Sequence, residues 1–262
     1  MNAFFAAFWS EALKARRSRI TPLTAAAIML LPLAGGLFML ILKDPAQAQS
    51  WGIISTKAEL TAGVADWTSY FDMLLQGTAM GGAILFAMIT AWVFGREFSD
   101  HTAKELMALP TSRAAIVAAK FALLGMWTMA LTILVVVVGL AVGWAVDIPG
   151  WSDELCWSSV RSMLSIAFFT TLLTPFTALV ASWGRGYLPP IGWTILSMVF
   201  ANIVVLLGWG DWFPWAIPVM ISGMVKSQAS AGGLHSYVVI FLACAAGLAA
   251  TLVWWQRADQ TR

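Results

Sequence analysis

The chain has 262 residues, of which 60% are hydrophobic and only 11% are charged, and its formal net charge is +2. A soluble domain carries roughly a quarter charged residues, so this composition excludes a water-soluble globular protein. The small net charge gives no reason to expect a nucleic-acid partner. The sequence is that of an integral membrane protein.

Residues 1–20 are predicted to form an interfacial helix at the inner surface of the membrane. The segment combines aromatic and apolar side chains with a basic cluster, which is the composition of a helix that lies in the headgroup region. The residues expected to anchor it are Phe8, Trp9, Lys14, Arg16, Arg17 and Arg19. A direct contact with a partner protein is the alternative, and the membrane anchor is favoured about two to one because it uses all of these features.

Six uncharged runs follow, each long enough to cross a bilayer as a helix, which takes about 20 residues. Strands of a membrane barrel would be about half as long and would alternate in polarity. The sequence therefore predicts an all-α integral membrane fold, with residues 1–262 forming a single transmembrane domain. The predicted spans are Pro22–Leu42, Met73–Gly95, Phe121–Val146, Ser162–Gly184, Gly186–Gly210 and Ser236–Gln256.

Between the second and third spans lies "REFSDHTAKELMALPTSR", residues 96–113, where charges gather around a short apolar stretch. Thr102 and Glu105 have the spacing of a capping box, and Pro110 is expected to end a short helix after Leu109. One face of that helix is apolar. It could rest on lipid headgroups or dock into a groove on a partner protein, and spacing alone leaves both open.

The loop after the fifth span, residues 211–235, contains an uncharged stretch that is too short to cross the membrane and is interrupted by Pro214 and Pro218. It is predicted to contain a re-entrant or interfacial helix in the outer leaflet. Such a helix could gate an exit path, and simple interfacial packing is at least as common. The acidic residues Asp153 and Glu154 are assigned to another solvated outer loop, between the third and fourth spans.

Lysine and arginine divide unequally between the two sides of the six-span arrangement. Eleven lie on the side that carries both termini and the 96–113 segment, and four lie on the other. The positive-inside rule therefore predicts that both termini are cytoplasmic.

Inside the predicted spans there is no Asp, Glu, Lys or Arg, which disfavours an ion-coupled carrier. The remaining polar residues mostly bond neighbouring helices in such proteins; the ones that could instead line a substrate path are Gln76, Thr170, Thr174 and Asn202. No phosphate-binding loop and no H-E-x-x-H or Cys/His cluster occurs. We therefore expect no catalytic residue, no metal site, no cofactor held by this chain and no enzymatic activity of its own.

The sequence resembles the permease subunits of ABC-2-type transporters, of the bacterial group that includes bacitracin and lantibiotic resistance exporters. The resemblance is carried by "FWSEALKARRSR", by "EFSDHTAKELMALPTSR" with Lys120, and by "DWFPWAIP". It implies that the 96–113 segment is the coupling helix that meets an ATPase. The residues expected to couple are Glu97, Thr102, Lys104, Leu106, Leu109, Pro110 and Arg113.

The resemblance also implies a function and partners. Two copies of the chain would pair in the bacterial plasma membrane, in contact with membrane lipids, and each would bind a separate ABC ATP-binding subunit that carries the ATP and Mg²⁺. The cargo would be an amphipathic peptide, antibiotic or lipid-like molecule moved outward. A six-span membrane scaffold or sensor without transport activity is the alternative from another class, and an ATPase encoded beside this chain would favour the transporter.

Overall fold

The computed structural model describes residues 3–44, 64–100, 102, 111–224 and 233–257. Within these ranges every regular element is a helix, and six are long and apolar enough to cross a membrane, which confirms the predicted all-α, six-span fold. In chain order the elements are α1 (Ala3–Arg17), α2 (Ile20–Lys43), α4 (Trp67–Gly77), the π-helical segment η1 (Thr78–Gly82), α5 (Ala83–Ser99), α7 (Arg113–Ala145), α8 (Asp153–Trp183), α9 (Leu188–Leu206), the 3₁₀ turn η2 (Gly210–Trp212), α10 (Ala216–Ile221) and α11 (Leu234–Arg257).

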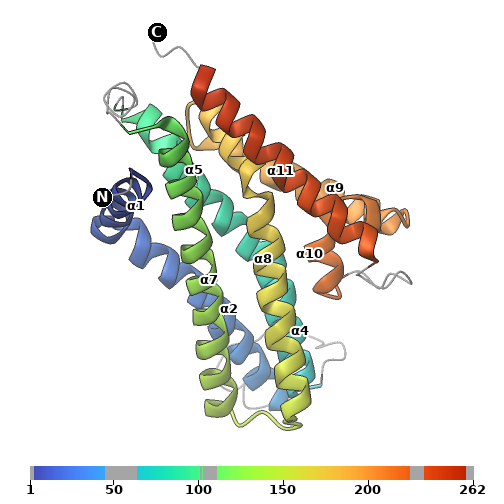
Figure 1. Ribbon diagram of the computed structural model, residues 1–262. Helices are drawn as coiled ribbons and strands as arrows, with labels where there is room; N and C mark the ends of the chain where they lie inside the picture. The colour runs from blue at the N-terminus through green and yellow to red at the C-terminus, as the bar shows by residue number, and fades with distance from the viewer. Residues whose placement is uncertain (1–2, 45–63, 101, 103–110, 225–232, 258–262) are drawn as a thin grey trace.

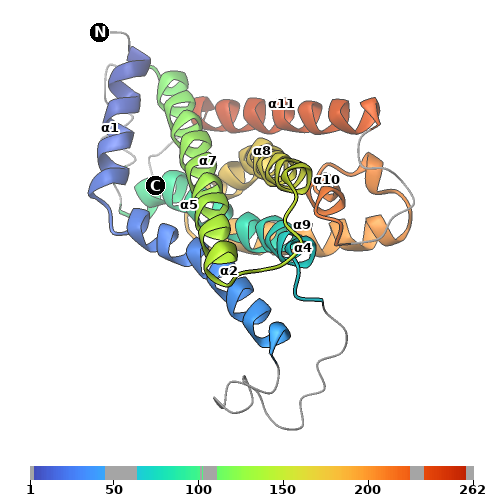
Figure 2. The ribbon, with the colours of Figure 1, turned by 90° about the horizontal axis from the view of Figure 1, so that it is seen from below.

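Helix α8 is the centre of the bundle (Figure 1). It packs against α5, α7, α9 and α11, and it also contacts α4 and the short α10. Helix α2 packs mainly on α7. Helix α1 is not part of a span: it turns away from α2 and lies beside α7, as Figure 2 shows. The N-terminal helix is therefore packed against protein on one side.

Local sequence signals account for several helix ends. Asp66 caps α4 by accepting a hydrogen bond from the backbone N–H of Ser69 at 2.8 Å, and the Ser112 hydroxyl accepts from the backbone N–H of Ala115 at the start of α7. Both side chains satisfy N–H groups that have no partner within the helix. Helix α9 ends just before Gly208, which has a φ of +81° that glycine adopts without strain.

Several helix bounds differ from the predicted spans. Helix α7 begins at Arg113 rather than Phe121, and α8 begins at Asp153 rather than Ser162, while the fifth span is shorter than predicted, at Leu188–Leu206. Apolar runs mark the hydrocarbon layer, whereas a helix can continue into the interfacial region, where charged side chains are tolerated. The assignment of Asp153 and Glu154 to a loop is wrong, because they form the first turn of α8. Acidic side chains at this position stabilise a helix by interacting with the positive end of its dipole.

The two glycines of the "GLAVG" stretch in α7 serve contacts within the chain. A Cβ at Gly143 would collide with the ring of Trp67, and a Cβ at Gly139 would lie 2.9 Å from the Leu74 side chain. The hydroxyl of Tyr70 also donates to the carbonyl of Gly139 at 3.2 Å. These small residues therefore let α4 approach α7 closely, as small residues do between membrane helices.

Candidate functional site

The predicted coupling segment joins the end of α5 to the start of α7. Its first residues belong to α5, which ends at Ser99, and Arg113 is the first residue of α7. Thr102 is exposed, and its backbone N–H donates to the carbonyl of Glu97 at 3.0 Å. Contact with an ATPase stays a prediction for all seven predicted coupling residues. Four of them lie outside the described ranges, namely Lys104, Leu106, Leu109 and Pro110.

Arg113 connects the start of α7 to the end of α11. Its Nη1 donates to the backbone carbonyls of Trp255 at 3.0 Å and Gln256 at 3.1 Å. The last carbonyls of a helix have no partner within it, and basic side chains often satisfy them. The Arg113 guanidinium therefore fastens two helices of this chain together, and its part in coupling stays a prediction.

A buried cluster of two acids and two bases joins α1, α5 and α7 next to the coupling segment. The Lys120 side chain of α7 is fully buried, and its Nζ donates to Glu97 Oε1 at 2.9 Å, to Glu11 Oε2 at 3.1 Å and to the Val93 carbonyl at 2.8 Å. Lys14 Nζ lies 2.6 Å from Glu11 Oε1 and 3.1 Å from Glu97 Oε1. The cluster has no net charge, so each buried ion is compensated.

The pairing holds the two groups of α1 in their charged forms. Burial on its own would raise the pKa of Glu11, but the ammonium groups of Lys120 and Lys14 outweigh it and hold that pKa below its ordinary value. Burial would likewise lower the pKa of Lys14, and the Glu97 and Glu11 carboxylates outweigh it and raise that pKa. Glu11 and Lys14 are therefore both charged at neutral pH.

Glu97 is buried within this cluster, with 5% of its surface exposed. Its side chain points to α1 and α7, so the structure gives it a place in the bundle and not on an exposed docking face. Sequence reasoning missed Glu11 altogether. The one available signal was Lys120, a lone charge between apolar residues, because such charges tend to face the protein interior and pair with acids.

The residues predicted to anchor α1 divide into two groups. Trp9, Arg16, Arg17 and Arg19 are exposed, as an interfacial position requires, whereas Phe8 packs against the bundle core and Lys14 belongs to the ion cluster. That α1 lies on headgroups stays a prediction. Its buried face is occupied by contacts with α7 and by the cluster.

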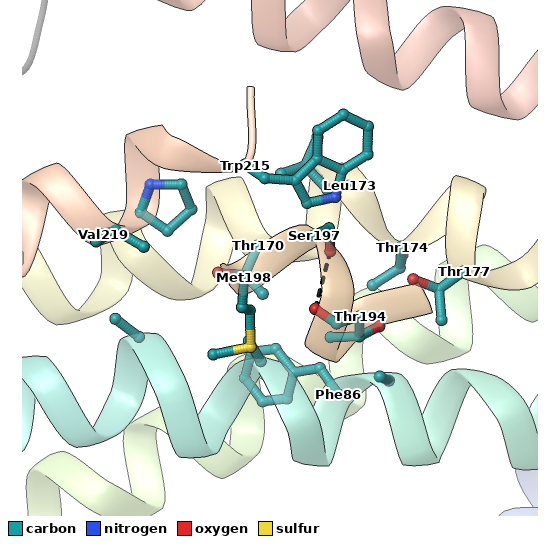
Figure 3. Close-up of a pocket in the computed structure, with 14 residues that line it drawn as sticks. Phe86, Thr170, Leu173, Thr174, Thr177, Thr194, Ser197, Met198, Trp215 and Val219 are labelled. Carbon is teal, nitrogen blue, oxygen red and sulfur yellow. Dashed lines mark hydrogen bonds between the residues drawn. The ribbon is translucent and has the colours of Figure 1, made fainter. Parts of the chain in front are cut away.

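A small cavity with several hydroxyl groups in a largely apolar lining lies further along the bundle, between α5, α8, α9 and α10 (Figure 3). Its volume is about 40 Å³, enough for one or a few water molecules. Phe86 and Trp215 lie on opposite sides of it, and Met198 extends toward Phe86. Its polar lining consists of the hydroxyl side chains of Thr170, Thr174, Thr177, Thr194 and Ser197.

Most of these hydroxyls are satisfied by their own helices. Thr194 donates to the Pro190 carbonyl, and Ser197 donates to the Thr194 carbonyl at 2.9 Å, as the dashed line in Figure 3 marks. The buried hydroxyl of Thr170 has no hydrogen-bond partner among the described residues. Two of the four candidate path residues, Thr170 and Thr174, therefore meet at the cavity. The lining does not include Gln76 or Asn202, and the Asn202 amide donates to the Met198 carbonyl of its own helix.

Part of the loop that was predicted to hold an outer-leaflet helix, residues 211–235, forms α10. This six-residue helix is buried at Ala216 to Met220 and packs against α8 and α9. Trp215 and Pro218 close the cavity from its side. Its depth in a bilayer stays a prediction.

Comparison with known proteins identifies the family. Residues 7–202 match the model of the ABC-2 family transporter protein. The bacitracin transport permease protein of Bacillus licheniformis is 28% identical over 193 residues, which cover 73% of this chain and 91% of that protein. The match spans α1, the ion cluster and the cavity-lining helices α5, α8 and most of α9. The chain belongs to the ABC-2 transporter family and is a multi-pass membrane permease subunit of the bacitracin-permease-like group.

Proposed function

We propose that this permease forms the membrane path of an ATP-driven exporter, as one of two copies that each bind a separate ATP-binding subunit. Membership of the ABC-2 family implies an ATP-binding partner. The partner would bind ATP and Mg²⁺ and would dock against the 96–113 segment, with both termini of the permease in the cytoplasm.

The observation that carries this proposal is the buried ion cluster beside the segment. Glu97 lies at the end of the helix that enters the segment, and Lys120 lies two turns into the helix that leaves it. Glu11 and Lys14 fasten both helices to α1, and Arg113 fastens the second helix to α11. A push on the segment would therefore move four helices together rather than bend one loop.

The cavity between α5, α8, α9 and α10 is too small to hold a cargo molecule in this conformation. Its volume of about 40 Å³ is far below the roughly 300–1,000 Å³ of pockets that hold drug-sized molecules. We propose that these helices separate during transport and that Thr170 and Thr174 then face the path. The cargo would be an amphipathic peptide, antibiotic or lipid-like molecule, a proposal supported by the uncharged lining and by the name of the bacitracin permease relative.

Leu106→Asp and Leu109→Asp, made singly, test the docking step. Burying either leucine in a groove of the partner would contribute roughly 1.5–3 kcal/mol, and a buried unpaired carboxylate would cost several kcal/mol more. Each variant should still insert in the membrane, yet fail to co-purify with the ATP-binding subunit or lose cargo-stimulated ATP hydrolysis.

Leu207→Asp is the matched control, because Leu207 is exposed at the opposite end of the bundle, just after α9. It should leave co-purification unchanged. Normal binding and normal export by both coupling-segment variants would show that the segment is not the docking site. Absence of any ATP-binding partner in purified complexes would favour the scaffold or sensor.

A further inference from the structure

An open groove of about 700 Å³ lies between α1 and the end of α5, on the side away from the central helix α8. Its wall contains two tryptophans, Trp9 and Trp92, and its charged residues are Lys14, Arg17, Arg96 and Asp100. Aromatic rings of this kind sit at the level of lipid headgroups. The groove is therefore polar, aromatic and open at the end of the bundle that carries the basic residues.

Some of the cationic groups in the groove are not neutralised by the acids around them. Lys14 is neutralised by Glu11 and Glu97. Arg96 lies 5.2 Å above the Trp92 ring, and within the described part of the chain only its Nε is hydrogen-bonded, to Asp100 Oδ2 at 3.2 Å. Arg17 is exposed and has no hydrogen bond or ion pair within the described part of the chain. Arg17 and the free edge of the Arg96 guanidinium thus remain available for an anion.

A second groove of about 500 Å³ adjoins the first and shares Trp92 of α5 with it. Beyond Trp92 the lining comes from α2, α5 and the start of α9, and it includes Leu23, Ala27, Leu85, Met88 and Ile191. From Arg96 to Leu85 the helix rises about 16 Å at roughly 1.5 Å per residue, which is close to half of the roughly 30 Å hydrocarbon thickness. The two grooves together therefore extend over about the thickness of one leaflet.

We propose that these two adjoining grooves together bind one anionic phospholipid of the leaflet on the α1 side, with its phosphate between Arg17 and Arg96 and an acyl chain along α2 and α5. Charge complementarity selects the anionic headgroup, because guanidinium groups pair with phosphate oxygens through two parallel hydrogen bonds. The order of cations, tryptophan and apolar wall along α5 matches the order of headgroup, interface and chain in a lipid. The bound lipid would bridge α1 and α5 directly beside the ion cluster.

The headgroup is tested by native mass spectrometry of the purified full-length chain with phosphatidylglycerol and with phosphatidylcholine of identical acyl chains. One phosphatidylglycerol per chain should be retained in preference. Arg17→Ala and Arg96→Ala should each weaken that retention about fivefold, the effect of about one basic residue at a membrane surface. Arg16→Ala is the matched control, since Arg16 is exposed on the same helix but does not line the groove, and retention should be unchanged.

The acyl chain is tested by a second matched pair on α2. Ala27 lines the apolar groove, whereas its neighbour Ala26 is exposed and does not. Ala27→Phe should therefore reduce retention of both phospholipids, and Ala26→Phe should not. The same spectra report whether two chains associate, and thermal unfolding of each variant reports whether it is folded.

Three outcomes would overturn the proposal. Equal retention of the two phospholipids would show that the arginines select no headgroup. An equal loss in Arg16→Ala would show that surface charge alone attracts the lipid. Dissociation of a two-chain complex by Ala27→Phe, with no lipid lost from any variant, would show that a second copy of the chain occupies the groove.

Discussion

The ion cluster and the cavity both bury polar side chains in this bundle, and they are built in opposite ways. The cluster consists of four charged groups from α1, α5 and α7, and Lys120 at its centre makes three hydrogen bonds. The cavity is lined by neutral hydroxyls from α8 and α9, most of which bond only their own helix, and Thr170 bonds none of the described residues. One region joins helices and the other leaves them independent.

The difference matches the tasks proposed for the two ends. Paired charges in a low-dielectric interior resist separation, because pulling one away leaves the other uncompensated. Hydroxyls that already donate to a carbonyl one turn earlier lose little when the neighbouring helix moves. The end beside the coupling segment is therefore suited to move as a unit, and the cavity is suited to open.

Removing the central base should have the largest effect on stability. Lys120→Met leaves two buried carboxylates with one lysine, and breaking a buried pair costs about 3–5 kcal/mol, which corresponds to a drop in Tm of about 10 °C in a chain of this size. Thermal unfolding in detergent measures it.

Two further variants make this prediction specific. Lys120→Met combined with Glu97→Gln restores neutrality and should recover most of the lost Tm. Lys43→Met removes an exposed pair with Asp147, whose Oδ2 lies 3.3 Å from the lysine Nζ, and such pairs contribute little. A double variant no better than Lys120→Met alone would show that the charge balance is irrelevant.

The pH dependence of stability should be an acid-side effect of Glu11. Its pKa is lowered in the folded chain from 4.5, so its stabilisation is complete above 4.5 and is lost as the pH falls through the folded value. The pKa of Lys14 is raised from 10.5, so its stabilisation is lost only above 10.5.

The Tm should therefore change little through neutral pH and fall in acid. The Tm advantage of the native chain over Glu11→Gln, measured at steps from neutral to acidic pH, should shrink toward acid. An advantage that grows toward acid would contradict the assigned direction.

The smallest effect on stability is expected at the cavity. Thr170→Val replaces a hydroxyl that has no partner in the described chain by a methyl group, which should leave the Tm unchanged or slightly higher. Thr128→Val is the comparison, since the Thr128 hydroxyl bonds the Leu124 carbonyl and the Thr171 hydroxyl and its loss should cost about 1 kcal/mol. In the complex with the ATP-binding subunit, Thr170→Val should alter cargo-stimulated ATP hydrolysis. Unaltered stimulation would place the cargo path elsewhere.

Local patterns in the sequence were enough to predict the spans. An apolar run of sufficient length has few alternatives to a crossing helix, and all six runs proved helical. The exact starts of α7 and α8 were not predictable in this way, because a helix that leaves the hydrocarbon keeps its backbone bonds while its side chains become charged.

The contacts of the ion cluster lay beyond local reasoning. Lys120 contacts Glu11, which is more than a hundred residues away in the sequence. From the sequence, a lysine at the end of an apolar run is equally consistent with a buried ion pair and with a cation at the membrane interface. Only two of the four predicted path residues line the cavity, for a similar reason. Polarity singled out Thr170 and Asn202 alike, but only the rotation of each helix about its axis decides which of them faces α5.

The π-helical segment Thr78–Gly82 places one extra residue in the middle of the second span. An inserted residue turns everything beyond it by about 100° relative to an uninterrupted α-helix of 3.6 residues per turn. Both halves contact α7 and α8, but the half before it, α4, also packs on α2, whereas the half after it, α5, also packs on α9. With a single helical periodicity, the two halves could not both orient their packing faces toward these neighbours. The π-helical segment therefore lets one span pack on different helices above and below it.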